Sequence, residues 1–254
     1  MVEMIRMTQA INCILASRRY LLRYVPGADM TDVGPVKCIR YAKPMSWETE
    51  AFFAVDQEPG VVVAAVRAYK PGPHLIAAYT GSPERVTAVY SDLGYTTTPK
   101  EPTETVMERT LESAEEAAER YPVRVARIDS DGGLPCAAGG RHWTTREELT
   151  DPAIRCYYID AGGRVVCWGK CGSLCSAAIR HVWGVHTERD HRRRGFASAL
   201  MRRIHADAAG TTEKVLLEAS PMGDLLYRAL GYEALAYKLK FVPKDLHAGT
   251  AASP

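Results

Sequence analysis

One stretch of the sequence, residues 182–200, constrains the fold more than any other. Residues 182–187 are mostly apolar and rich in β-branched side chains, which predicts a largely buried strand. A polar turn follows at 188–194, and from Gly195 onward the apolar residues recur at helical spacing. The sequence therefore predicts a strand that runs through a basic turn into a helix.

Such a junction is suited to binding an anion. The first amides of a helix have no acceptor within the helix, and the helix dipole favours negative charge there. Gly195 has no Cβ that would block the close approach of a phosphate, and Ala197 is the next smallest choice. The alternative is a basic surface turn or a nucleic-acid-binding patch over residues 189–203, which would show affinity that falls steeply with salt.

The turn and the following helix carry two motifs. Arg192-x-x-Gly195-x-Ala197 resembles the Arg/Gln-x-x-Gly-x-Gly/Ala signature of the GCN5-related N-acetyltransferases, and Val185-His-Thr187 resembles the Val-x-Thr that precedes it in one branch. Residues 216–232 are similar to the strand and helix of that family that end in Tyr-x-x-Leu-Gly-Phe/Tyr, here Tyr227 to Tyr232. The resemblance covers residues 155–243.

The resemblance implies a fold. We expect an α+β protein with the acyl-CoA N-acyltransferase (GNAT) fold, in which a mixed, mostly antiparallel sheet has flanking helices, preceded by a smaller α/β N-terminal domain. Residues 1–121 would form that N-terminal domain, residues 122–243 the catalytic domain, and residues 244–254 a disordered tail.

The resemblance also implies acetyl-CoA as cosubstrate and no metal. The pyrophosphate of coenzyme A would be held by the turn and the start of the helix, at Arg192, Arg193, Arg194, Gly195, Phe196, Ala197 and Ser198. The backbone of Val185, His186 and Thr187 would bind the pantetheine arm and the thioester carbonyl, where such donors also stabilise an oxyanion.

Two side chains are candidates for proton transfer. Tyr227 matches the tyrosine that protonates the leaving thiolate in this family, and a phenol with a pKa of about 10 is protonated at neutral pH; its alternative role is packing. Glu218 is the general base we favour, with His186, Glu188 or a water relay as alternatives. The expected reaction is direct attack of a primary amine on the thioester in a ternary complex. The alternative is a coenzyme A-binding pseudoenzyme or interaction module that transfers no acyl group.

Composition and charge limit the binding partners and the cellular location that we expect. A net charge of +2 argues against a nucleic-acid partner, and the sequence has no apolar run long enough to predict a membrane span. Residues 1–24 predict an amphipathic helix and not a secretory signal, because charges interrupt the apolar positions.

Seven cysteines at irregular spacing favour a reducing, cytoplasmic location. The acceptor is expected to be a small-molecule or peptide amine, and a homodimer is compatible with the sequence.

The N-terminal half contains a weaker copy of the second motif. Residues 60–69 and 74–79 predict two strands joined by a short turn, and residues 83–93 predict a helix that ends in Tyr90-x-x-Leu-Gly-Tyr95. The match to Tyr227 and Tyr232 suggests an internal duplication with a degenerate N-terminal copy. Because a short turn replaces the segment that follows Arg192, this copy is expected to lack the phosphate cradle.

The remaining elements follow from local patterns. Residues 30–33 predict a loop, residues 44–53 a weak helix, and residues 102–120 a strong helix with a capping box at Thr105-x-x-Glu108. In the C-terminal half the patterns predict a strand at 123–128, a capped helix at Thr145-x-x-Glu148, a hairpin at 156–169, strands at 214–219 and 232–242, and a helix at 223–230.

Overall fold

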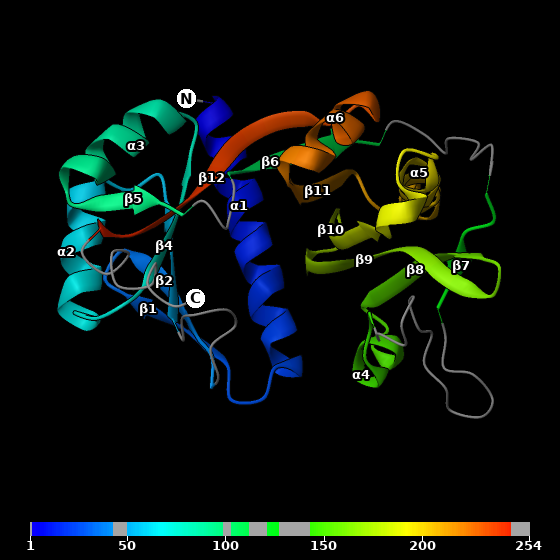
Figure 1. The fold of residues 1–254 in the computed structure, drawn as a ribbon, viewed down its shortest axis with the longest axis horizontal. Coiled ribbons are helices and arrows are strands. Elements are labelled where there is room, and N and C mark those ends of the chain that lie inside the picture. The colour runs from blue at the N-terminus through cyan, green and yellow to red at the C-terminus, as the bar shows by residue number, and fades with distance from the viewer. Residues whose placement is uncertain (1, 43–49, 99–102, 112–120, 127–142, 245–254) are drawn as a thin grey trace. The chain divides into compact units, whose positions relative to one another are not determined.

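The computed structural model describes residues 2–42, 50–98, 103–111, 121–126 and 143–244 (Figure 1). The chain forms two compact units. Unit 1 comprises residues 1–107, 219–225 and 234–254, and unit 2 comprises residues 108–218 and 226–233. Residues 245–254 of the expected tail and residues 127–128 of the strand predicted at 123–128 lie outside the described residues. The described part of that predicted strand contains β7, Arg124–Val125. The division into an N-terminal domain of residues 1–121 and a catalytic domain of residues 122–243 remains a prediction.

Unit 1 is built on a mixed sheet whose strand order is β1-β2-β3-β4-β12. The strands are β1 (Asp29–Val33), β2 (Val36–Arg40), β3 (Glu50–Val55), β4 (Leu75–Thr80) and β12 (Glu233–Pro243). Strands β3 and β4 run parallel, and the other neighbours are antiparallel. The short strand β5 (Tyr95–Thr97) pairs with β12.

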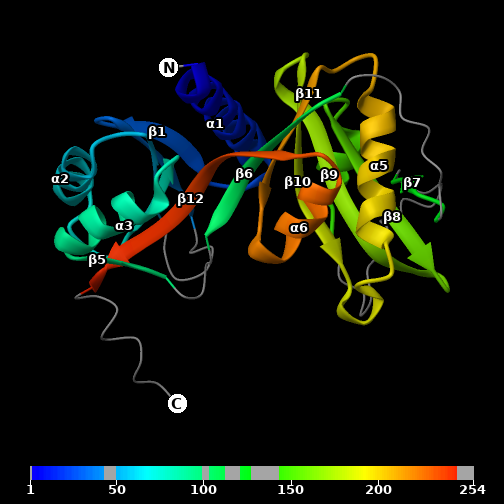
Figure 2. The ribbon, with the colours of Figure 1, turned by 90° about the horizontal axis from the view of Figure 1, so that it is seen from above.

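Helices cover both faces of the unit 1 sheet (Figure 2). Helix α1 (Val2–Leu21) packs Ile11 and Ile14 against one face, in a cluster with Phe53 and Tyr79. Helices α2 (Pro59–Tyr69) and α3 (Pro83–Asp92) pack against the opposite face, which carries Phe52 and Ile76. Because both faces are covered, every residue of β4 is buried, as expected for a central parallel strand. The predicted N-terminal helix is confirmed, although the apolar Met4 and Ile5 near its start are exposed.

The strand predicted at residues 60–69 is wrong, because these residues form α2. Pro59 occupies the first helical position, where its missing N–H costs nothing. Val62, Val63 and Val66 are buried on the sheet while Val61 is 55% exposed, so burial of one helical face overrides the strand preference of valine. The predicted turn between two strands is therefore a full helix between β3 and β4.

Two other predictions in the N-terminal half are wrong. Residues 104–110 form strand β6 and not a capped helix. The charged ends of this strand hid its pattern: Glu104 pairs with Lys238 at 2.5 Å, and the buried Glu108 pairs with Lys214 at 3.2 Å. The loop predicted at 30–33 belongs to β1, and residues 50–53 belong to β3 and not to a helix.

Unit 2 contains the elements that the C-terminal sequence predicts. Its strand order is β6-β11-β10-β9-β8-β7, with β8 (Ile154–Ala161), β9 (Arg164–Ser176), β10 (Ile179–Thr187) and β11 (Lys214–Ala219). Strands β8, β9 and β10 are antiparallel neighbours, and β11 runs parallel to β10. Helix α5 (Phe196–Ala208) connects β10 to β11 and packs on β8, β9 and β10. Helix α6 (Pro221–Ala229) follows β11.

The two faces of the unit 2 sheet are set by alternation along β9. A Cβ built on Gly169 would lie 2.9 Å from Cδ2 of Leu200 in α5, so residue 169 faces that helix. Side chains alternate along a strand, so Trp168 and Lys170 lie on the opposite face. The register places His186 beside Trp168 and Trp183 beside Lys170. The face away from α5 therefore carries these four side chains.

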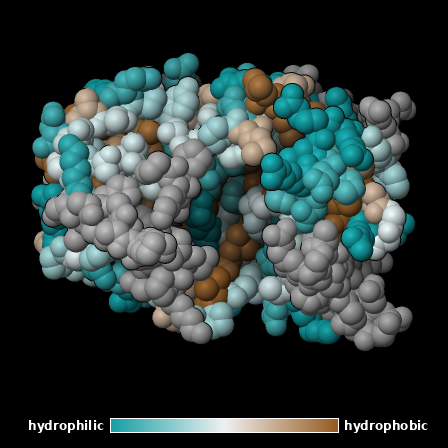
Figure 3. Space-filling model, viewed as in Figure 1, coloured by the Kyte–Doolittle hydropathy of each residue, from teal (hydrophilic) through white to brown (hydrophobic). Residues whose placement is uncertain are grey.

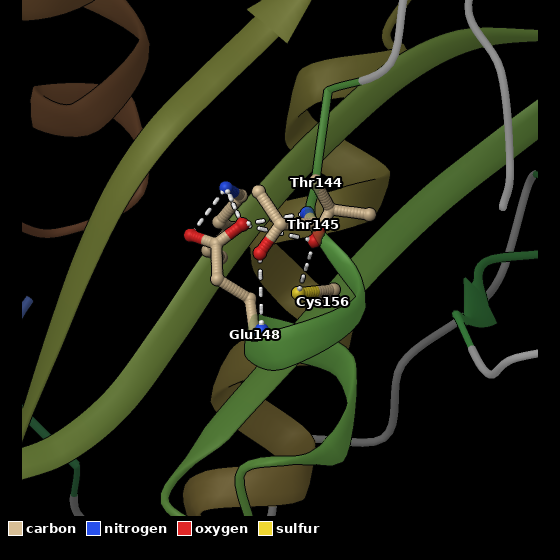
Figure 4. A network of polar contacts seen from close by, with 5 residues as sticks. Thr144, Thr145, Glu148 and Cys156 are labelled. Carbon is tan, nitrogen blue, oxygen red and sulfur yellow. Dashed lines mark hydrogen bonds and ion pairs between the residues drawn. The ribbon is translucent and has the colours of Figure 1, made fainter. Parts of the chain in front are cut away.

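A short helix, α4 (Arg146–Thr150), is tied to the face away from α5 by one carboxylate (Figure 4). The predicted capping box is present: the Glu148 amide donates to the Thr145 hydroxyl, and the Glu148 carboxylate accepts from the Thr145 amide. The same carboxylate accepts from Nζ of Lys170 at 2.6 and 2.7 Å and from the hydroxyl of Thr144. The side chains of both Lys170 and Glu148 are about nine-tenths buried.

Replacing Glu148 by glutamine is expected to lower the free energy of unfolding by about 3 kcal/mol, because the charge of Lys170 would lose its buried partner. Glutamine can still complete the capping box, so the loss reports on the ion pair. Urea unfolding measures it, with the exposed Glu147→Gln on the same helix as control. Equal stability of the two variants would show that the pair contributes nothing.

Two further findings concern the described residues. None of their helices is long and apolar enough to cross a membrane. Cys38, Cys156, Cys167 and Cys171 are buried free thiols.

Candidate functional site

Strand β10 separates from β11 before either strand ends. Their parallel pairing extends from Ile179 with Lys214 to Val182 with Leu217. Beyond Val182, strand β10 pairs with β9 alone, at Trp183, His186 and Thr187. The ladder that joins β10 to β11 thus ends at Val182, and residues 183–187 are no longer paired with β11. A backbone edge of this kind can bond an extended ligand as an added strand would.

An irregularity in β10 lies at the same place. The register with β9 shifts between Trp183 and His186, and Gly184 inside this shift has a φ of +63°. Such bulges bend a strand and redirect its edge. Gly184 is exposed, which is unusual in the middle of a central strand.

A tight turn joins the end of β10 to α5. Residues Arg189–His191 form a 3₁₀ turn, and Arg193 and Gly195 have φ values of +62° and +89°. Glycine suits the second of these positions, since other residues avoid a positive φ. No side chain caps α5, and its first internal bond joins the amide of Ala199 to the carbonyl of Gly195 at 3.0 Å. The amides of residues 196–198 therefore have no acceptor within the helix.

Two side chains fix the carbonyl groups of this turn. Nε of Arg192 donates to the Thr187 carbonyl at 3.0 Å, and the hydroxyl of Tyr121 donates to the Arg194 carbonyl at 2.8 Å. The ring of Tyr121 also packs on Phe196, with centroids 4.3 Å apart. With these carbonyls bound from within the protein, the turn can present its amides to an anion.

The surroundings of the turn are open and polar. Arg189, Arg193, Arg194 and Gly195 are exposed, and hydrophilic surface gathers over the region of α5 in Figure 3. Phe196 is buried beneath, while Ala197 and Ser198 are half-buried. Exposed arginines next to helix amides that have no acceptor within the helix suit a polyphosphate.

Tyr227 lies near the end of the separated strand. It is 7% exposed, and burial, followed by the nearby Cys167 thiol, raises its pKa to about 12. Cys167 pairs with Thr187 in the register and accepts a hydrogen bond from its hydroxyl at 3.3 Å. Tyr227 is thus a protonated phenol close to the last residues of β10.

The candidate bases lie on the face away from α5. Val182 pairs with Leu217, so Glu218, the next residue of β11, falls beside Trp183 on that face. His186 stacks on Trp168 with centroids 4.4 Å apart, and its Nε2 lies 3.9 Å from Oε2 of Glu188. Among the described residues, no group of three or more His, Cys, Asp or Glu is arranged to hold a metal ion.

In unit 1, the two strands that correspond to β10 and β11 do not separate. Its elements β3, α2, β4 and α3 follow the same order as β10, α5, β11 and α6. However, β3 pairs with β4 along its whole length from Ala51 to Val55, and the amide of Asp56 continues the pairing to Tyr79. Acidic Asp56 and Glu58 precede α2, and Pro59 supplies no amide. This helix start is therefore unsuited to an anion.

Sequence reasoning missed several residues around the site. Tyr121 was placed at a domain boundary, and Arg109, His205 and the hydroxyl of Tyr232 were assigned no role. His205 accepts from Arg109 at 2.9 Å and lies 2.8 Å from the Tyr232 hydroxyl. These partners are between 27 and 96 positions apart in the chain, so no local pattern could have identified them.

Comparison with solved structures shows a recurring fold. The chain is similar to a GCN5-related N-acetyltransferase from Kribbella flavida, with a TM-score of 0.59, 16% identity, and coverage of 91% of this chain and 95% of the other. It is similar to a GCN5-related N-acetyltransferase from Sphaerobacter thermophilus, with a TM-score of 0.55, 16% identity, and coverage of 88% and 84%. A functionally unknown protein from Staphylococcus epidermidis gives a TM-score of 0.58 at 10% identity, covering 88% of this chain and 97% of the other.

No protein-family sequence model matches the chain, and no curated protein matches its sequence. The structural likeness therefore defines the fold. The chain has the GNAT fold, with a mixed, mostly antiparallel sheet and flanking helices, as its two motifs predict.

Proposed function

We propose that the protein is an acetyl-CoA-dependent N-acetyltransferase that acetylates a small-molecule or peptide primary amine. The observation that carries the proposal is the separation of β10 from β11 directly before an uncapped helix N-terminus. An extended ligand with a polyphosphate at one end, as in coenzyme A, matches a strand edge that has separated from its neighbour, followed by helix amides that have no acceptor within the helix.

The proposed binding roles follow from this geometry. The backbone of Val185, His186 and Thr187 would bond the pantetheine arm and the thioester carbonyl. The turn and helix start, from Arg192 through Ser198, would hold the pyrophosphate by amides and arginines. Nε of Arg192 already bonds the Thr187 carbonyl, and its amide bonds the Arg189 carbonyl at 3.3 Å. We therefore assign Arg192 to shaping the turn and leave phosphate contact to Arg193, Arg194 and the amides of residues 196–198.

The proposed reaction is a direct transfer. A base removes one proton from the acceptor ammonium, the amine nitrogen attacks the thioester carbon, and the C–S bond breaks as the nitrogen loses its second proton and the amide forms. Tyr227 donates its proton to the leaving thiolate and is reprotonated from solvent, which takes up the second proton of the nitrogen. Amides of β10 stabilise the oxyanion. Glu218 is the proposed base, with His186 beside Glu188 as the alternative. These roles are supported by the strand register, by which Glu218 and His186 lie on one face of the sheet, and by the proximity of Tyr227 to Cys167, the register partner of Thr187.

Because β3 stays paired with β4 in unit 1, we propose that acetyl-CoA binds in unit 2 alone. We infer that unit 1 contains a duplicated and degenerate copy of the same fold. The shared order of elements supports this, and so does the repeated Tyr-x-x-Leu-Gly-Tyr after β4 and β11. Helix α2 occupies residues 59–69, so the cradle of this copy is absent because its strands stay paired and not because a short turn replaces the helix.

Thiol release from acetyl-CoA tests the proposal. The purified protein is incubated with a panel of amino acids, polyamines, aminoglycosides and lysine peptides, and products are identified by mass spectrometry. The proposal predicts an acetylated amine together with one equivalent of free thiol. Acetyl-CoA binding without transfer to any amine would instead support a coenzyme A-binding pseudoenzyme.

A further inference from the structure

A buried polar chain in unit 2 ends on Tyr232, whose ring packs on the proposed acid Tyr227. It begins at Arg109 in β6, continues through His205 in α5 and reaches Tyr232, the residue that precedes β12. Nη1 of Arg109 lies 2.9 Å from Nδ1 of His205, and Nε2 of His205 lies 2.8 Å from the hydroxyl of Tyr232. His205 is 1% exposed and Tyr232 is 4% exposed.

The tautomer of His205 follows from its partners. A guanidinium only donates hydrogen bonds, so Nδ1 must accept from Arg109. Burial, reinforced by Arg109 and Arg202, lowers the pKa of His205 to about 3, so the ring is neutral near neutral pH. Its one proton is then on Nε2 and is donated to the Tyr232 oxygen. The hydroxyl hydrogen of Tyr232 is directed away from the imidazole.

Tyr232 is coupled to Tyr227 by two contacts. The Tyr232 amide donates to the Tyr227 carbonyl at 3.0 Å, which closes the end of α6. Their rings pack edge to face, with centroids 5.6 Å apart and an interplanar angle of 67°. A hydrogen bond that fixes the ring of Tyr232 therefore also restricts the ring of Tyr227.

We propose that Arg109, His205 and Tyr232 position the Tyr227 phenol for proton donation, so that His205 and Tyr232 are positioning residues of the acyl transfer. This inference rests on the proposed function. Geometry of this kind affects turnover because a reacting group displaced by about 1 Å can lose roughly 100-fold in rate.

Unit 1 supplies a matched control. There Nε2 of His74 lies 2.8 Å from the Tyr95 hydroxyl, and Tyr95 packs edge to face on Tyr90 with centroids 5.9 Å apart. Nδ1 of His74 contacts the Gly72 carbonyl at 2.8 Å, so it donates and Nε2 accepts from Tyr95, the reverse of unit 2. Among the described residues, the buried Tyr90 hydroxyl has no hydrogen-bond partner. The arrangement has the same packing role in both units, but only Tyr227 stands beside a separated strand.

The test compares Tyr232→Phe with Tyr95→Phe, each of which removes one hydroxyl and keeps the ring. Turnover is measured by thiol release with the amine from the panel that gives the highest rate. We expect Tyr232→Phe to lower kcat roughly 10-fold or more, up to about 100-fold, with the KM for acetyl-CoA unchanged. Tyr95→Phe should lose a similar amount of thermal stability without loss of kcat.

Variants of the histidine separate positioning from folding. His205→Leu should lower kcat as Tyr232→Phe does, and His205→Gln, whose amide can donate to the Tyr232 oxygen, should recover most of the rate. Equal kcat values for Tyr232→Phe and Tyr95→Phe, or no recovery by glutamine, would overturn the inference. If wild type has no turnover, or Tyr227→Phe leaves turnover unchanged, the proposed function or acid is wrong and the inference fails with it.

Discussion

Replacing Gly195 by glutamate is expected to weaken acetyl-CoA binding at least roughly 100-fold, because like charges in contact cost several kcal/mol and about 1.4 kcal/mol is a factor of ten. The new carboxylate would stand where the pyrophosphate is proposed to bind, at the start of α5. A second effect acts through the backbone, since the φ of Gly195 is +89° and a residue with a Cβ is strained there by about 1–2 kcal/mol. Titration calorimetry measures the affinity.

The backbone effect has its own control at the other end of the helix. Gly210 follows α5 with a φ of +78°, and a Cβ there would meet nothing within 4 Å. Gly210→Glu adds the same charge and similar strain to unit 2, and it should bind acetyl-CoA as wild type does. Wild-type affinity in Gly195→Glu would place the pyrophosphate elsewhere, and an equal loss in both variants would attribute the effect to folding.

Replacing Tyr227 by phenylalanine is expected to lower kcat by roughly 100-fold, the lower end of what a positioned general acid contributes. Acetyl-CoA affinity should change little, because the phenyl ring keeps its packing on Tyr232. Burial raises the pKa of Tyr227 to about 12, so the wild-type phenol remains protonated across the neutral range and turnover should not fall with its ionisation there. Steady-state kinetics with varied acetyl-CoA separate kcat from KM.

The matched control is Tyr90→Phe in unit 1. Tyr90 occupies the same place in the repeated motif, but its buried hydroxyl has no hydrogen-bond partner in the part of the chain that the structure describes. Its ring stacks on Phe241 with centroids 4.2 Å apart. Removing that hydroxyl should leave kcat unchanged and should not destabilise the protein, because no hydrogen bond is lost. Unchanged kcat in Tyr227→Phe as well would return Tyr227 to a packing role.

The sequence predicted unit 2 more closely than unit 1, for physical reasons. In unit 2 the buried strands, the Thr145 capping box and the helix beginning after Gly195 each have a local pattern. In unit 1, the valines of α2 are helical because burial against the sheet outweighs their intrinsic strand preference. In β6, two glutamates at strand positions are neutralised by lysines distant in the sequence, so the charges obscured a buried strand.

The candidate site, too, could be predicted from the sequence only in part. The glycine of the turn and the tyrosine of α6 belong to motifs with fixed spacing, so sequence could nominate them. The separation of β10 from β11 is a property of backbone pairing, and no side chain in β10 specifies it. The Tyr121 bond to the Arg194 carbonyl and the chain from Arg109 to Tyr232 join residues that only the tertiary fold brings together.

Hydrogen–deuterium exchange with and without saturating acetyl-CoA tests the central claim most directly, because it reports on the backbone groups proposed to bind. The account predicts slower exchange at the amides of residues 183–187 and 193–198, and no change at residues 55–61, the closed junction of unit 1. Unchanged exchange at both segments of unit 2, or protection at the unit 1 junction instead, would contradict it.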